Sequence, residues 1–105
     1  MIVIASSGGD VGICQAIEVL RDGGSAIDAV EVGIRHVESN PEDRGVGLGG
    51  MPNLLGEVEL DATIMDGATL QAGAVGAVKG YEHPISLARK VMEELWHVFL
   101  VGAGA

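Results

Sequence analysis

The sequence predicts a layered α/β protein in which a β-hairpin lies beneath helices, and three patterns carry this prediction. The first is a stretch of alternating apolar and polar residues on both sides of an Asp-Gly turn. The second is apolar residues that recur every three or four positions, the period of a helix with one packed face. The third is a pair of short apolar runs near the two ends of the chain, which indicate buried strands. A length of 105 residues allows one domain, spanning residues 1–105.

The hairpin is predicted over Gly56–Val78, where two alternating arms flank Asp66-Gly67. An Asp-Gly pair between such arms is a strong short-range hairpin signal, because both residues tolerate the left-handed conformations of a tight turn. The apolar face of the first arm comprises Val58, Leu60, Ala62 and Ile64. Strict alternation in the second arm puts Val75 and Val78 on opposite faces. That arm carries no charge, so we expect it to be covered on both faces.

Two helices are predicted before the hairpin. Asp10 is expected to cap the first helix, which stops at Gly23-Gly24. Its apolar stripe comprises Ile13, Ala16, Ile17 and Leu20. Ser25 precedes the second helix, and with Asp28 it forms a pattern like a capping box. This helix is expected to end near Asn40, because a residue that precedes proline is pushed out of the helical region.

The remaining segments are a glycine-rich loop, a third helix and the two apolar runs. Glu42–Leu55 contains four glycines and is expected to be irregular. Pro84 suits the first turn of a helix, and we expect His83 to cap that helix. Met1–Ala5 and Trp96–Val101 are each predicted to form a buried strand.

Composition and charge exclude several classes of protein. The net charge is −9, from 15 acidic and 6 basic residues, so no basic patch exists to neutralise phosphates, and we expect no nucleic-acid and no membrane partner. No apolar run approaches the roughly 18 residues of a membrane span, and the N-terminus lacks a basic signal region, so a cytoplasmic location is expected. The single cysteine, Cys14, cannot form an internal disulfide, and its apolar helical context predicts a buried thiol.

No catalytic set or metal site is evident from residue spacing. His36, His83 and His97 lack partners at metal-ligand spacing, and we expect neither a metal nor a cofactor. Ser6 and Ser7 follow the first predicted strand, a place where α/β proteins often expose reactive groups, but no G-x-S-x-G elbow surrounds them. The glycine-rich loops leave a small nucleotide-binding domain as a weak alternative, since the third glycine and the phosphate-binding helix of the dinucleotide fingerprint are missing.

Six segments of the chain match one family in order and in spacing. They are GGSAIDAVEVGIRHVE (Gly23–Glu38), GVGLGGMPN (Gly45–Asn53), GEVELDATIMDG (Gly56–Gly67), AGAVGAV (Ala72–Val78), HPISLARKVME (His83–Glu93) and HVFLVGAGA (His97–Ala105). Together they resemble the glycosylasparaginase branch of the N-terminal-nucleophile hydrolases, which is akin to the plant-type asparaginases and isoaspartyl peptidases. Residues 1–22 match this branch only loosely.

The resemblance implies a fold and a chemistry. The expected fold is part of an α-β-β-α sandwich of the N-terminal-nucleophile hydrolase type, with this chain as the α-chain portion. Members of the family are made as precursors that cleave themselves before a threonine by autoproteolysis. The freed threonine then acts as nucleophile and, through its own amine, as base. The implied reaction is cleavage of the side-chain amide of asparagine, glycosylasparagine or isoaspartyl compounds.

The chain also departs from the family pattern. Thr63 and Thr69 are its only threonines, and neither stands in the nucleophile context, so no catalytic residue is assigned and the isolated chain is expected to be inactive. The resemblance implies that one wall of the substrate pocket is formed by Ser6, Ser7, Gly8 and Gly9. A small amide substrate is expected only in a complete enzyme, with a β-like chain or a second copy as partner. The alternative is a truncated, non-catalytic relative that acts as a structural or interaction module.

Overall fold

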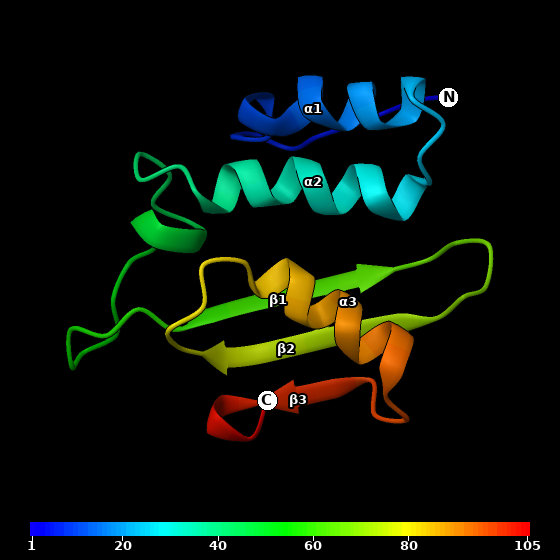
Figure 1. The fold of residues 1–105 in the computed structure, drawn as a ribbon. Coiled ribbons are helices and arrows are strands. Elements are labelled where there is room, and N and C mark those ends of the chain that lie inside the picture. The colour runs from blue at the N-terminus through cyan, green and yellow to red at the C-terminus, as the bar shows by residue number, and fades with distance from the viewer.

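The computed structural model describes residues 1–105 and contains three α-helices and one three-stranded sheet. The helices are α1 (Asp10–Arg21), α2 (Ala26–Glu38) and α3 (Pro84–Glu94), and the strands are β1 (Leu60–Met65), β2 (Ala72–Val78) and β3 (Phe99–Val101). Figure 1 shows α1 and α2 side by side as a helical hairpin, with α3 lying across one face of the sheet. The thinnest dimension is 17 Å, which is room for one helix on one sheet. The prediction of a layered α/β protein is therefore confirmed for one sheet covered by one helix.

Local sequence signals determine where α1 ends and where α2 begins. Ser25 and Asp28 form a reciprocal capping box at the start of α2, in which the Asp28 N–H donates to Ser25 Oγ at 3.1 Å and the Ser25 N–H donates to Asp28 Oδ2 at 3.0 Å. Gly23, which follows the C-cap residue Asp22 of α1, has a φ of +86°, a conformation that favours glycine. The two helices approach closely, because a Cβ added at Gly12 would overlap the Gly33 carbonyl.

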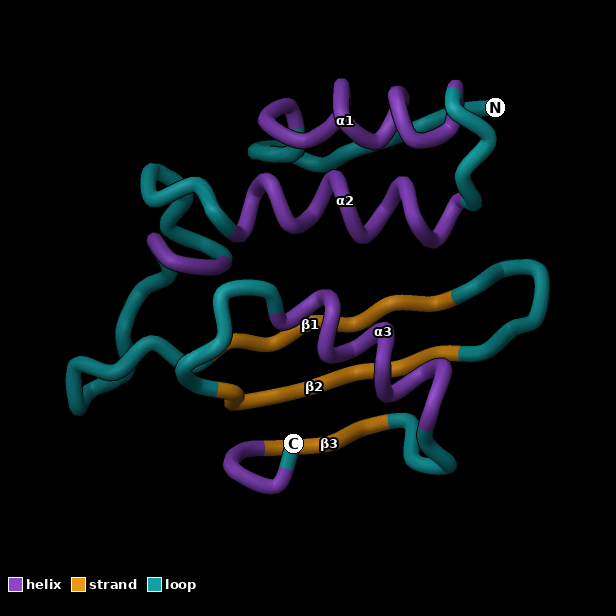
Figure 2. The backbone as a smooth tube through the Cα atoms, in the orientation of Figure 1, coloured by secondary structure: helices purple, strands orange, loops and turns teal.

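The predicted hairpin is confirmed, with β1 and β2 antiparallel. Its connection is longer than a two-residue turn: the Asp66 N–H donates to the Gln71 carbonyl at 2.9 Å, and Leu70 has a φ of +60°. The tube in Figure 2 shows this extended loop between the two strands. Leu70 therefore belongs to the connection and not to the second strand.

A β-bulge in β2 overturns the predicted alternation of its side chains. The register shifts near the start of β1, so that β2 carries one extra residue there. Ala77 in the bulge has a φ of +50°, and its N–H donates to Asp61 Oδ1 at 2.8 Å. Because the extra residue reverses the alternation, Val75 and Val78 both lie in the core, 2% and 1% exposed. The prediction that they occupy opposite faces is wrong.

The core lies between the sheet and α3. Strand β2 is central, antiparallel to β1 and parallel to β3. The core residues are Ile64, Val75, Val78, Ile85, Ala88, Val91 and Met92. Helix α3 approaches β2 closely, since a Cβ added at Gly73 would overlap the Ala88 carbonyl oxygen. On the opposite face Met65, Phe99 and Val101 are more than half exposed, so the expected cover is present on one face only.

The two apolar end segments differ from their predictions. Met1–Ala5 is not a strand, and Ile2 and Ile4 are 85% and 88% exposed. It runs beside α1, where the chain offers no neighbouring strand to accept its backbone hydrogen bonds (Figure 1). In the second segment only Phe99–Val101 forms a strand, and the Trp96 side chain is fully exposed. Both predictions of a buried strand are therefore wrong in burial, and the first is also wrong in structure.

The exposure of the single cysteine differs from its prediction. Cys14 is exposed, so the predicted buried thiol is wrong. The stripe that contains the buried Ala16 packs against α2, and a residue two positions earlier on a helix points away from that stripe.

None of the three helices has the length and apolar character that crossing a bilayer requires.

Candidate functional site

A cavity of about 490 Å³ lies between the N-terminal segment, α1, α2 and the loop that follows α2. All four residues predicted as a pocket wall line it, namely Ser6, Ser7, Gly8 and Gly9. Much of the remaining lining is apolar and comes from the facing sides of the two helices, including Ile13, Ala16, Ile34 and Val37. The structure therefore brings the four predicted residues together at one concave surface.

A tight turn positions these four residues. The Gly9 N–H donates to the Ser6 carbonyl at 3.0 Å, and Gly8 has a φ of +87°. Gly9 is the residue at the N-cap of α1, and Asp10 is already inside the first turn, so the prediction that Asp10 caps this helix is wrong. A carboxylate in the first turn still interacts favourably with the helix dipole.

Asp43 supplies the single carboxylate of the cavity, and the sequence reasoning missed it. Its Oδ1 accepts from the Gly45 N–H at 2.7 Å and from the Val46 N–H at 3.2 Å, which fixes the loop after α2. A Cβ added at Gly8 would lie 2.9 Å from Asp43 Oδ2, so glycine lets the carboxylate come this close. The signal for Asp43 is the Asp-x-Gly pattern of a turn closed by the aspartate side chain.

The chemical groups of the cavity suit binding better than catalysis. Two serines and one aspartate stand beside an apolar floor, the usual composition of a site for a small polar molecule. No histidine or lysine lines the cavity, and neither serine hydroxyl is hydrogen-bonded to the Asp43 carboxylate, whose Oδ1 accepts from Gly45 and Val46. No group of three or more His, Cys, Asp or Glu side chains lies close enough together to hold a metal ion.

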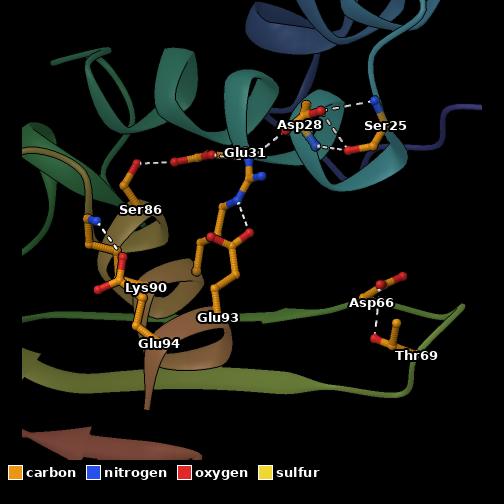
Figure 3. A network of polar contacts seen from close by, with 10 residues as sticks. Ser25, Asp28, Glu31, Asp66, Thr69, Ser86, Lys90, Glu93 and Glu94 are labelled. Carbon is orange, nitrogen blue, oxygen red and sulfur yellow. Dashed lines mark hydrogen bonds and ion pairs between the residues drawn. The ribbon is translucent and has the colours of Figure 1, made fainter.

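Both threonines lie in the hairpin and outside the cavity. Thr63 is part of β1. The Thr69 hydroxyl donates to Asp66 Oδ2 at 2.9 Å in the connection between the strands (Figure 3). Thr69 therefore has a structural hydrogen bond, and neither threonine is placed as a nucleophile in this chain.

A buried carboxyl joins α2 to the start of α3. Glu38 is 2% exposed, and its Oε1 accepts from the Ile85 N–H at 3.0 Å. Its Oε2 lies 3.2 Å from His83 Nδ1. Burial raises the pKa of Glu38, and the hydrogen bonds from Ile85 and His83 oppose this effect. His83 itself makes no capping hydrogen bond, so the prediction that it caps α3 is wrong. Glu38 supplies that cap from the neighbouring helix.

A second polar contact between these helices centres on Arg89. Its guanidinium lies 2.8 Å from Asp28 Oδ1 and 2.7 Å from Glu31 Oε2, both on α2. Glu31 also accepts from the Ser86 hydroxyl, and Figure 3 shows these two side chains facing each other across the helices. Hydrogen bonds from Ser25 and then from Arg89 lower the pKa of Asp28 to about 2. Glu93 is the third carboxylate, with its Oε1 2.7 Å from Arg89 Nε. The charge of Arg89 is therefore balanced by ion pairs within the fold.

Comparison with known proteins identifies relatives over most of the chain. The family profile described as asparaginase matches residues 10–105. The chain is 50% identical over 91 residues to the N(4)-(β-N-acetylglucosaminyl)-L-asparaginase of Elizabethkingia miricola, which covers 87% of this chain and 26% of that protein. It is 53% identical over 87 residues to the isoaspartyl peptidase/L-asparaginase of Homo sapiens, covering 83% and 28%. It is 54% identical over 82 residues to the plant-type L-asparaginase of Pyrococcus horikoshii, covering 78% and 27%.

The matches cover most of this chain and a small part of each relative. It spans about a quarter of the length of the curated relatives that it matches. The match begins at the first residue of α1 and includes the hairpin, α3 and β3. The chain therefore belongs to the asparaginase family that includes the plant-type asparaginases and the glycosylasparaginases.

Proposed function

We propose that this chain is the α-chain-like part of an amidohydrolase. The enzyme would cleave the side-chain amide of asparagine, glycosylasparagine or isoaspartyl compounds, with the threonine nucleophile outside these 105 residues. The observation that carries the proposal is the identity of 50% to 54% to three relatives whose names state these activities. Neither serine hydroxyl in the cavity is hydrogen-bonded to a base, which supports the view that the nucleophile comes from elsewhere.

In this proposal the chain contributes one wall of the substrate pocket and one half of a layered core. The wall is the turn of Ser6, Ser7, Gly8 and Gly9, with Asp43 opposite Gly8. The half core is the sheet with α3 on one face. The uncovered face, where Phe99 and Val101 are exposed, would receive the second sheet of an N-terminal-nucleophile sandwich. A β-like chain, generated with it by autoproteolysis of one precursor, is the partner that this arrangement requires.

Amide hydrolysis assays test this proposal. The chain alone is expected to release no aspartate from L-asparagine, from N4-glucosaminyl asparagine or from a β-aspartyl dipeptide. Mixing it with a β-like chain that begins at a threonine is expected to produce turnover, and the same partner with that threonine replaced by alanine is the control. Turnover by the isolated chain would show that the nucleophile lies within it, against the proposal. A stable mixed complex without turnover would contradict the enzymatic role.

The second candidate is a non-catalytic interaction module, and the exposed apolar surface favours it. Trp96, Phe99 and Val101 are 102%, 59% and 54% exposed, and large exposed apolar patches mark sites of protein association. Under this alternative the chain pairs with another copy of itself or with an unrelated chain. Light scattering tests for either kind of association, because a well-dispersed monomer would argue against any need for a partner.

A further inference from the structure

The carboxyl of Glu38 is the one charged side chain buried in this chain. It stands at the C-terminal end of α2 and reaches the first turn of α3, where it accepts the Ile85 N–H at 3.0 Å. Pro84 has no N–H, so Ile85 supplies the first free backbone donor of α3. His83 Nδ1, at 3.2 Å, contacts the other oxygen. One carboxyl therefore links two helices that are 47 residues apart at this contact.

The charges around Glu38 come from three elements. On α2 itself, Arg35 acts on the carboxyl by charge attraction. Before α3, His83 contacts it directly, and His83 Nε2 lies 3.7 Å from Glu82 Oε1 on the outer side. Glu59, just before β1, and Asp61, in β1, line the same cavity of about 230 Å³ as Glu38, and both are exposed. The loop residues that share this cavity carry no charge, and Lys79 Nζ lies 3.9 Å from Glu59 Oε1.

We propose that the contact of Glu38 with His83 and Ile85 is a pH-sensitive joint that fixes α2 against the start of α3. The joint is closed while the buried Glu38 carboxyl holds a proton, and it loosens when the carboxyl loses that proton. The protonated carboxyl is neutral, so its burial carries no cost of an unsolvated charge. After the proton leaves, the charge of the carboxylate is buried, and the contacts with Ile85 and His83 compensate only part of the cost of burial.

Solvent reaches this pair from one side. The His83 side chain is 21% exposed and lines a shallow cavity of about 230 Å³ with Arg35, His36 and Ser39. The Ser39 hydroxyl donates to Glu82 Oε1 at 2.7 Å, which holds a carboxylate beside the outer imidazole nitrogen.

The sign of the effect follows from linkage between proton binding and conformation. Burial raises the pKa of Glu38 above its ordinary value of 4.5, so the closed state binds a proton at pH values where the open state does not. Closure is therefore favoured below pH 4.5 and weakens as the pH rises through the raised pKa. Release of one proton changes the closing equilibrium by at most about tenfold per pH unit.

The joint also bears on the candidate site. Helix α2 contributes Val30, Gly33, Ile34 and Val37 to the lining of the 490 Å³ cavity. A change in how α2 is held at its C-terminal end therefore changes the position of one wall of that cavity. The joint itself does not depend on the proposed hydrolase function, and its test requires no enzyme assay.

Amide hydrogen exchange at Ile85 tests the joint in the 105-residue chain. After correction for the intrinsic exchange rate, the protection of Ile85 is expected to fall as the pH rises above 4.5, by up to about tenfold per unit. Glu38→Gln keeps a carbonyl oxygen for the Ile85 N–H and removes the titrating group, so its protection is expected to be independent of pH. Glu82→Gln, which alters an exposed neighbour of the same histidine, is the control and is expected to retain the dependence.

A direct titration of Glu38 complements the exchange measurement. The ¹³C shift of its side-chain carboxyl is expected to give a midpoint above 4.5 in the unsubstituted chain. This readout does not depend on whether any variant folds. A midpoint at or below 4.5 would overturn the proposal, as would an unchanged pH dependence in Glu38→Gln or a lack of Ile85 protection at every pH.

Discussion

Truncation of Val78 to alanine tests the β-bulge and the packing of the hairpin together. Val78 is 1% exposed and belongs to the same apolar cluster as Val75, which is 2% exposed. Removing two methyl groups loses about 1.6 kcal/mol of burial free energy at about 0.8 kcal/mol each, and the cavity that remains adds to this loss. We expect Val78→Ala and Val75→Ala each to lower the free energy of unfolding by about 2 kcal/mol.

Urea denaturation followed by circular dichroism measures these losses. At an m-value of about 1–2 kcal/mol/M, a loss of about 2 kcal/mol lowers the midpoint by about 1–2 M. Val98→Ala is the matched control, because Val98 is 59% exposed and its truncation is expected to change stability by less than about 0.5 kcal/mol. The double variant of Val75 and Val78 is expected to be non-additive, since both side chains contact one cluster.

The β-bulge and strict alternation predict different stabilities for the two valine variants. If β2 alternated without the bulge, Val75 and Val78 would lie on opposite faces, and only one of them would pack beneath α3. A Val78→Ala variant as stable as Val98→Ala, beside a destabilised Val75→Ala, would refute the bulge and the core assignment of Val78.

Three further changes test local features. Asp61→Ala removes the acceptor of the Ala77 N–H and is expected to cost about 1 kcal/mol, whereas Asp61→Asn retains an oxygen and is expected to cost less; urea midpoints for the two variants decide this. Ser25→Ala removes the cap of α2 at a cost of about 1 kcal/mol. The same variant is expected to alter the acid unfolding profile, because the pKa of Asp28 is lowered from 3.8 to about 2, so its stabilisation is present above pH 3.8 and is lost as the pH falls to about 2. Melting temperatures measured between pH 2 and 5 should show a smaller loss in Ser25→Ala than in the unsubstituted chain. Gly8→Ala places a side chain at a φ of +87° and is expected to cost about 1–2 kcal/mol; unchanged stability would contradict the turn geometry at the cavity wall.

Features set by neighbouring residues could be predicted from the sequence. The capping box of Ser25 and Asp28 depends on residues three apart, and both of its hydrogen bonds are present. The start of α3 at Pro84 follows from the fixed φ of proline and its missing N–H. The four residues of the predicted pocket wall are adjacent in the chain, so the turn that gathers them is also a local event.

The features that the sequence reasoning missed depend on distant partners. Cap assignment failed at α3 because the cap is Glu38, which comes from another helix and not from the adjacent His83. Asp43 reaches the cavity only because the loop after α2 folds back toward Gly8. The strand predicted at Met1–Ala5 has strand-like residues, but strand formation requires a neighbouring strand that this chain does not place there.

By itself the sequence determined the helices, the hairpin and the membership of the asparaginase family, because periodicity, capping and ordered motifs are properties of short segments. Tertiary structure alone decided that Val75 and Val78 share one core and that Glu38 is buried between two helices. It also decided that only one face of the sheet is covered. The physical reason is that burial and strand register depend on residues that are distant in the sequence and close together in the fold. Neither a one-residue bulge nor a cap supplied by a distant helix produces a periodic pattern in the sequence from which it could be predicted.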